Sequence, residues 1–227
     1  MIIRKYGIEL RRVTAADIEL IRQERNRDSV RQHMFHQEII TAEQQRQWFA
    51  SIDNFHCYYF LICHQGKPLG LLQGKYVDYE ARTNEGGIFL WQQDASSMGI
   101  ATKASICFID ASFRLLRLNK VYAHVRPDNP AAYHYNLSLG YVPCPEKGDN
   151  YLVLTRAAYD SKIAKLRHIA SAGKDLTPLE MSDIDIPDAT AKRYLYDPLP
   201  ADIFEQARVL FEQPNGWLTP RKVASCH

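Results

Sequence analysis

The chain has 227 residues, of which 46% are hydrophobic and 24% are charged, and its formal net charge is +2. This length allows one large domain, or a domain of about 150 residues with an appendage. The composition is that of a globular protein that can bury a core of its own. The small net charge and the lack of a long basic run argue against a nucleic-acid-binding protein.

The cysteines and the N-terminal residues bear on the compartment. The five cysteines form no CxxC pair, and Cys57, Cys63 and Cys107 lie in apolar stretches, which is typical of small core residues in a reducing environment. Residues 1–5 lack the apolar region of a signal peptide. No apolar stretch reaches the length of a membrane span. We therefore expect a cytoplasmic protein that does not interact with a membrane.

The first part of the chain predicts a strand and two capped helices. A short strand at residues 8–10 precedes a helix that Thr14 caps, with Asp17 in the capping-box position. A second helix begins after Thr41, which has a glutamine three residues later. The segment between these helices, residues 29–40, is expected to be a loop or a broken helix.

Alternation, helical spacing and turn residues predict the elements that follow. The polar residues 78–85 separate two strands of an antiparallel meander. The expected elements are strands at 58–63, 69–77 and 87–91, a helix at 101–118, a strand at 121–125, a helix at 131–139 closed by Gly140, and a strand at 151–155. The order β-α-α-β-β-β-α-β-α-β predicts a mixed α/β fold with a partly antiparallel sheet.

The character of the chain changes after about residue 155. Residues 157–171 are compatible with a helix, residues 173–200 are rich in Asp and Pro, and residues 200–213 suit a short helix. Apolar residues are too sparse here for a second independent core. We therefore expect residues 158–227 to form an extension that packs on the first domain or on a second copy of the chain, so that a homodimer is an open alternative.

The most informative stretch is residues 91–104, WQQDASSMGIATKA, where a predicted strand ends and a helix begins at Gly99. A helix N-terminus presents free N–H groups and the positive end of the helix dipole, and it binds phosphate without basic side chains. Gly99 and Ala101 would let a pyrophosphate approach the backbone closely. An ordinary strand-to-helix turn fits this pattern equally well.

Two later motifs extend this pattern into a resemblance. Residues 96–101 are followed by Asn-Pro-Ala-Ala at residues 129–132 and by Ser-Leu-Gly-Tyr at residues 138–141. The chain therefore resembles the GNAT acetyltransferases, whose signature is Q/R-x-x-G-x-G/A, then N-x-x-A and a closing Leu-Gly-Phe. The resemblance covers about two-thirds of the chain. It implies the GNAT acyl-CoA acyltransferase fold, a mixed and mostly antiparallel central sheet flanked by helices, in a domain spanning residues 1–157.

The N-terminal third is similar to two branches of that family. The matching positions are Arg25-Asn26, Ile40-Thr41 and Gln47-Trp48-Phe49. One branch contains ribosomal-protein N-terminal acetyltransferases. The other acetylates nucleotide-linked aminosugars, as in pseudaminic acid synthesis.

The resemblance also implies acetyl-CoA as co-substrate, with no metal. The strand ending at Leu90 and Trp91 would receive the pantetheine arm, amides of the phosphate loop would bind the pyrophosphate, and Asn129 would bond the pantetheine. The implied cofactor-binding residues are Leu90, Trp91, Met98, Gly99, Ile100, Ala101, Thr102, Asn129 and Ala132. The histidines lack the helical spacing of a zinc site, which agrees with a metal-free reaction.

Two positions depart from the family pattern. Ser96 stands where the phosphate loop usually has Gln or Arg, so one side-chain contact is lost while the backbone amides remain. Asn136 stands where many members have a tyrosine that protonates the leaving thiolate. Tyr135 is the preferred replacement and Tyr133 the other candidate; without either, the thiolate leaves unassisted.

Acetyl transfer further requires an oxyanion donor and a base. A backbone N–H near Trp91 is the expected oxyanion donor. Glu85, at the start of the strand that leads to the thioester, is the leading base, although a solvated turn residue is an equal interpretation. His36 and His56 are weaker candidates, either for contacting the substrate or as surface histidines.

We therefore expect direct acetyl transfer, in a ternary complex, to a primary amine of a small molecule. A nucleotide-linked aminosugar is preferred because aromatic side chains offer stacking surfaces. The candidate substrate-binding residues are Met34, Phe35, His36 and Trp48. The alternatives are a protein N-terminus as acceptor, and a binding protein that keeps the fold without catalysis.

Overall fold

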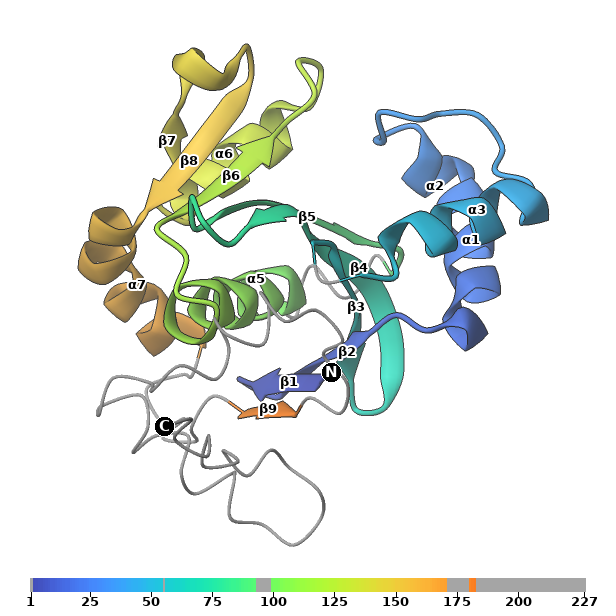
Figure 1. Cartoon of the computed structure of the whole chain (residues 1–227), viewed down its shortest axis with the longest axis horizontal. Coiled ribbons are helices and arrows are strands. Elements are labelled where there is room, and N and C mark those ends of the chain that lie inside the picture. Colours follow the sequence, from blue (N-terminus) through green and yellow to red (C-terminus); the bar gives the residue numbers. More distant parts are fainter. Residues whose placement is uncertain (1, 55, 93–98, 171–179, 183–227) are drawn as a thin grey trace, which may run out of the picture.

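The computed structural model describes residues 2–54, 56–92, 99–170 and 180–182. Its nine-stranded sheet has the order β7-β8-β6-β5-β4-β3-β2-β1-β9, and neighbouring strands are antiparallel except for β5 and β6 (Figure 1). The strands are β1 (Ile2–Lys5), β2 (Ile8–Arg12), β3 (Tyr58–His64), β4 (Lys67–Asp78), β5 (Thr83–Leu90), β6 (Lys120–His124), β7 (Val142–Pro143), β8 (Tyr151–Thr155) and β9 (Glu180–Ser182). The predicted mixed α/β fold with a mostly antiparallel sheet is confirmed.

Helices flank the sheet, and the first of them begin where local capping predicts. The helices are η1 (Ala15–Asp17), α1 (Ile18–Asn26), α2 (Asp28–Arg31), α3 (Ala42–Ile52), α5 (Ile100–Asp110), the π-helical turn η2 (Ala111–Leu115), α6 (Pro130–Ser138), η3 (Pro145–Lys147) and α7 (Arg156–Ala170). The backbone N–H of Thr14 donates to Asp17 at 2.9 Å, and the side chain of Thr41 accepts from the N–H of Gln44 at 3.2 Å. In Figure 1, α1, α2 and α3 lie together at the end of the molecule away from α7.

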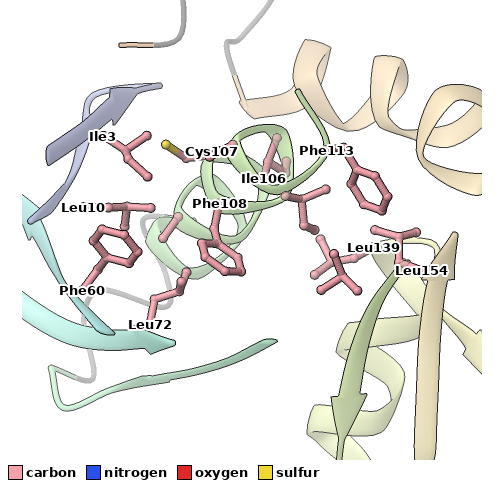
Figure 2. Packing of buried hydrophobic residues seen from close by; sticks show 14 of the residues in the cluster. Ile3, Leu10, Phe60, Leu72, Ile106, Cys107, Phe108, Phe113, Leu139 and Leu154 are labelled. Atoms are coloured by element: carbon pink, nitrogen blue, oxygen red, sulfur yellow. The ribbon is translucent and has the colours of Figure 1, made fainter. Parts of the chain in front are cut away.

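The central strands build one hydrophobic core on each face, because successive side chains of a strand point to opposite faces. On one face, the ring of Phe60 contacts that of Phe108 from α5, with centroids 6.3 Å apart (Figure 2). On the other face, Leu61 packs in a cluster with Ile21 of α1 and Ile52 of α3. The helix α5 therefore covers one face and α1 with α3 cover the opposite one.

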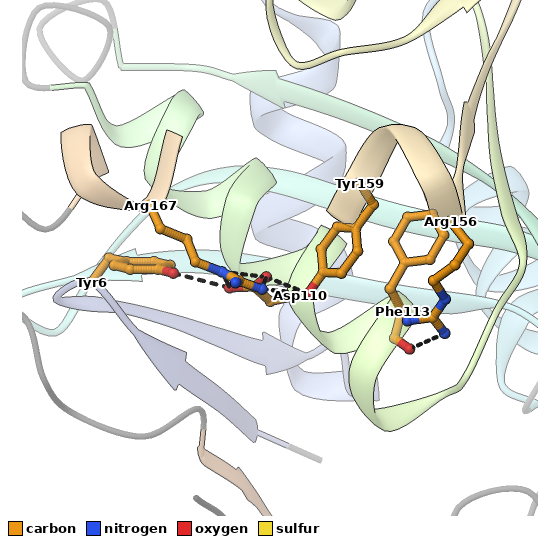
Figure 3. A network of polar contacts seen from close by, with 6 residues as sticks. All are labelled: Tyr6, Asp110, Phe113, Arg156, Tyr159 and Arg167. Carbon is orange, nitrogen blue, oxygen red and sulfur yellow. Dashed lines mark hydrogen bonds and ion pairs between the residues drawn. The ribbon is translucent and has the colours of Figure 1, made fainter. Parts of the chain in front are cut away.

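A buried carboxylate joins α7 to α5 and to the turn after β1. Asp110 is 1% exposed and accepts hydrogen bonds from the hydroxyls of Tyr6 and Tyr159, each at 2.9 Å, and from Nη2 of Arg167 at 2.6 Å (Figure 3). Burial and the nearby carboxylate raise the pKa of both tyrosines, so both remain protonated donors at neutral pH. Segments far apart in sequence thus meet at one side chain.

The start of β5 differs from the prediction. Residues 78–85 were expected to be a polar connection, but β5 begins at Thr83 and pairs with β6 from that residue onward. Asn84 is 1% exposed, and the carboxylate of Glu85 lies 2.9 Å from Nζ of Lys75 on β4. The start of the strand therefore contains buried polar side chains, one of them ion-paired across the strands, and a search for alternating apolar residues does not detect such a segment.

Other differences concern the edges of the sheet and the end of the chain. Strand β1, which pairs with β2, and the short strands β7 and β9 were not predicted. Strand β9 pairs antiparallel with β1. The expectations for residues 173–179 and 183–227 lie outside the described residues. No helix within the described ranges is long and apolar enough to cross a membrane.

Replacing Asp110 with Asn should lower the free energy of unfolding by about 3–5 kcal/mol, because Arg167 would lose the buried carboxylate that compensates its charge. Asp28→Asn is the matched control, since its ion pair with Arg31 lies at the surface, where the Asp28 side chain is 89% exposed. The control should stay near the wild-type value. Chemical denaturation followed by circular dichroism measures both variants. Similar small losses in the two would show that the buried network does not hold α7.

Candidate functional site

The strands β5 and β6 pair over only part of their length and then separate. Their parallel register runs from Thr83 opposite Lys120 to Gly86 opposite Ala123. Strand β5 continues to Leu90 without a strand partner on that side among the described residues. Figure 1 shows β6 and β8 diverging from β5. Residues on both sides of this gap line a cavity of about 1010 Å³.

The free part of β5 directs backbone groups into the gap. The N–H of Trp91 donates to the carbonyl of Leu69 on β4 at 3.1 Å. In an antiparallel ladder, residues bonded to the neighbouring strand alternate with residues whose backbone points the other way. The N–H and C=O groups of Ile88 and Leu90 therefore point toward β6. The oxyanion donor expected near Trp91 is not Trp91 itself, because β4 already accepts that N–H.

The cavity reaches both faces of the sheet through the gap. On the face covered by α5 and α6 it is lined by Ser105, Phe108 and Tyr135, and on the face covered by α1 and α3 by Arg25 and Trp48. A long, thin molecule entering from one face and a second molecule entering from the other would meet between the strands. This arrangement suits a reaction between two substrates bound at the same time.

The N-terminus of α5 carries the features expected of a phosphate site. Gly99 is the N-cap, with φ +67° in the left-handed region, and a Cβ built on it would meet nothing within 4 Å. The N–H of Lys103 makes the first helical bond, to the carbonyl of Gly99 at 3.0 Å. The N–H groups of Ile100, Ala101 and Thr102 thus precede the first helical hydrogen bond. Met98 and Ser96 lie outside the described residues.

The N-terminus of α6 supplies another part of the cavity wall. Asn129 is the N-cap, and its Oδ1 accepts from the N–H of Ala132 at 3.0 Å. This leaves the Nδ2 amide for a ligand. Asn136, at the position where a tyrosine is typical, donates from Nδ2 to the carbonyl of Ala132 at 2.8 Å. All three residues line the cavity.

The two candidate tyrosines occupy different places. Tyr135 lines the cavity, and its hydroxyl donates to Oγ of Ser105 at 2.8 Å. Burial raises the pKa of Tyr135 to about 12, so that it carries its proton throughout the neutral range. Tyr133 packs against the main core and is not among the residues that line the cavity. Of the two, only Tyr135 is placed to reach a ligand there.

Glu85 lies behind Lys75 in the wall of the site. It is 6% exposed, so the interpretation of Glu85 as a solvated turn residue is wrong. Its carboxylate is paired with Lys75, and of these two residues Lys75 is the one that lines the cavity. An amine in the cavity would therefore meet the ammonium of Lys75 before the carboxylate of Glu85.

The candidate substrate-binding residues all line the cavity: Met34, Phe35, His36 and Trp48. Phe35 is 62% exposed and stacks on His124 of β6, with centroids 4.8 Å apart. Arg126, just after β6, donates from Nη1 to the carbonyl of Met34. These contacts fix the loop after α2 across the end of β6. His56, in contrast, is not a lining residue and bonds the backbone of β4 through Nδ1.

Asn26 links α1 to Ile40, a residue 14 positions later in the chain. Its Nδ2 donates to the carbonyl of Ile40 at 2.9 Å, and its Oδ1 accepts from the N–H of Ile40 at 2.8 Å. These two hydrogen bonds hold the loop between α2 and α3 against α1. Sequence reasoning missed the neighbouring Arg25, and also Gln45 and Lys75, as cavity residues.

A family model of the acetyltransferase (GNAT) domain matches residues 8–142, and the chain belongs to this family. A comparison with curated proteins found no match. The fold is similar to the spermidine N-acetyltransferase of Vibrio cholerae in complex with CoA and spermine, with a TM-score of 0.61, 20% identity, and coverage of 69% of this chain and 100% of that one. It is also similar to the aminoglycoside acetyltransferase AAC(6')-Ib in complex with coenzyme A, with a TM-score of 0.57, 19% identity, and coverage of 67% and 97%.

The family identifies the reaction class and the acetyl donor. The protein is an N-acetyltransferase, and acetyl-CoA is its co-substrate. The predicted family, fold and reaction class are confirmed. Among the described residues, no group of three or more His, Cys, Asp or Glu side chains is placed to hold a metal ion.

Replacing Gly99 with Asp should abolish CoA binding, because a carboxylate and a Cβ would stand in front of the amides that start α5. Gly99→Ala is the control for the backbone, since its Cβ meets open space and only the left-handed conformation is penalised. Its affinity should fall much less. Calorimetry with CoA measures both variants, and wild-type affinity in a folded Gly99→Asp protein would refute this phosphate site.

Proposed function

We propose that the protein transfers the acetyl group of acetyl-CoA directly to the primary amine of a small molecule, with both substrates bound together. The observation that carries this proposal is the single cavity that reaches both faces of the sheet through the gap between β5 and β6. A covalent acetyl-enzyme is unnecessary, because the gap lets the two substrates meet directly.

For the donor, the chain offers polar groups on three elements, α5, β5 and α6; of these groups, those of Ile88 and Asn129 belong to lining residues of the cavity. The amides at the start of α5 would hold the pyrophosphate, and the backbone of Ile88 and Leu90 would pair with the pantetheine arm. The Nδ2 amide of Asn129 would bond the same arm, and the small side chain of Ala132 would leave room for it. The thioester carbonyl then comes to lie near the amides of β5.

Each chemical requirement of the reaction has a candidate group. An amide of Ile88 or Leu90 would stabilise the oxyanion that forms on the thioester carbonyl. Tyr135 would donate its proton to the departing thiolate. Glu85 is the proposed base. Because it does not line the cavity and is paired with Lys75, we propose that one water carries the amine proton to it.

For the acceptor, we propose a nucleotide-linked aminosugar. Trp48 and the exposed ring of Phe35 offer faces for a base or a sugar. Cations also line the cavity, from Arg25, Lys75 and Arg126, while no Asp or Glu is among its described lining residues. This charge distribution disfavours a polyamine, which carries several positive charges.

The setting of the protein is part of the proposal. We place it in the cytoplasm, which agrees with the free thiols of Cys57, Cys63, Cys107 and Cys144 among the described residues. A homodimer stays a prediction, because most of the extension after α7 lies outside the described residues.

An amine panel tests the proposed reaction. Thiol release from acetyl-CoA should be fastest with a UDP-linked aminosugar, slower with glucosamine, and slowest with spermidine. A peptide with a free N-terminus represents the alternative acceptor. Turnover of the peptide alone would favour the protein N-terminal function, and tight CoA binding without turnover of any amine would favour a non-catalytic binding protein.

Replacing Tyr135 with Phe should lower kcat by about 10- to 100-fold with little change in KM, because the hydroxyl acts on the leaving thiolate. Tyr133→Phe is the matched control, since Tyr133 does not line the cavity, and its kcat should stay near that of the wild type. Steady-state kinetics with the best amine of the panel measures both variants. An unchanged kcat in Tyr135→Phe would mean that the thiolate leaves without a protein acid.

A further inference from the structure

Two hydrogen-bond donors on the acceptor side of the cavity have no acceptor within the described protein. Gln45 of α3 is 3% exposed, and its Nε2 makes no hydrogen bond. Such groups are rare, because buried polar atoms are normally paired. Arg25 of α1 lines the same cavity, and it forms no ion pair with a described carboxylate.

Both donors belong to one aromatic wall. The guanidinium of Arg25 lies 5.5 Å from the ring centroid of Phe89 on β5. Trp48, one helical turn after Gln45, packs edge-on against Tyr59 with centroids 5.2 Å apart, and both aromatic rings line the cavity. These rings replace water around the charge, and burial lowers the pKa of Arg25. An anion placed here would compensate a charge that the protein leaves uncompensated.

We propose that Arg25 and Gln45 bind an oxyanion carried by the acceptor, a phosphate or carboxylate attached to the molecule whose amine is acetylated. That the anion belongs to the acceptor rests on the proposed function. The guanidinium supplies charge and a fork of donors that matches such groups, and Nε2 of Gln45 supplies a further donor. A neutral sugar ring could accept hydrogen bonds through its hydroxyl oxygens, but it would bring no charge to compensate the guanidinium of Arg25.

The position of the two residues separates this site from the donor's phosphates. Arg25 and Gln45 lie on α1 and α3, which cover the face opposite α5. The amides expected to hold the CoA pyrophosphate begin α5. The two anion sites therefore lie on opposite sides of the gap, and a ligand can occupy the acceptor site while CoA is bound.

Calorimetry with inorganic pyrophosphate tests the anion site directly. The titration is performed without CoA and again with saturating CoA, which fills the donor's phosphate site. The wild type should bind pyrophosphate in both conditions. Arg25→Ala should weaken binding by about tenfold or more, the loss expected for a charge-assisted hydrogen bond, and Gln45→Met should weaken it less. Arg25→Lys should retain part of the affinity.

The matched control is Arg46→Ala, which removes an exposed arginine next to Gln45 that pairs with Glu43 and does not line the cavity. It should bind pyrophosphate like the wild type. Melting temperatures identify any variant that fails to fold. If Arg25→Ala is such a variant, the pyrophosphate affinities of Arg25→Lys and Gln45→Met test the anion site in its place. The inference is overturned by absence of binding to the wild type, by unchanged binding in folded Arg25 variants, or by complete competition from CoA.

Kinetics separate this inference from the proposed function. Wild-type kcat/KM should be higher for glucosamine 6-phosphate than for glucosamine, and Arg25→Ala should reduce that ratio mainly through KM for the phosphorylated amine. Arginine-dependent pyrophosphate binding without turnover of any amine would overturn the proposed reaction and support the anion site. Turnover with no preference for a phosphorylated amine in any variant would overturn the site and leave the reaction standing.

Discussion

The site depends on the point at which β5 and β6 stop pairing. The last pair is Gly86 with Ala123, and each strand remains bonded on its outer side, β5 to β4 and β6 to β8. Beyond this pair, β5 stays paired with β4 as far as Leu90 opposite Gly70, and the side chain of Gln73 on β4 lies beside Gly87, where a Cβ would sit 2.7 Å from its Nε2. Strand β5 is therefore held against β4 while β6 turns away, and the gap is built into the sheet before any ligand enters.

The layers around this gap give each substrate its own face. The helix α5 has to be fixed firmly on its face, because its first turn carries the amides that we assign to the pyrophosphate. Its C-terminal residue Asp110 binds Tyr6, Tyr159 and Arg167, so that α7 and the first hairpin anchor the helix at the end opposite the site. The opposite face is covered by α1 and α3, which contribute Arg25, Gln45 and Trp48 to the cavity lining.

The features that the sequence predicts well are those determined by neighbouring residues. The caps at Thr14 and Thr41 use partners three residues away, and both helices begin there. Glu85 was ambiguous because its partner, Lys75, is on another strand. The choice between Tyr133 and Tyr135 depends on how α6 is rotated, which the Asn129 cap and the packing against Ser105 decide together. Neither contact can be inferred from spacing alone.

The sequence did not predict the anion site for a different reason: its evidence is a buried hydrogen-bond donor that has no hydrogen-bond partner. Only the folded chain shows that Gln45 is buried with Nε2 unpaired. The same electrostatics constrain the shape of the acceptor. The charge of Lys75 is compensated by Glu85, whereas Arg25 has no described carboxylate partner, so a cationic group would be repelled at Arg25. An acceptor that places its anion at Arg25 and its uncharged amine at the gap satisfies both ends of the cavity, which is why we favour an aminosugar joined to a phosphate over a free polyamine.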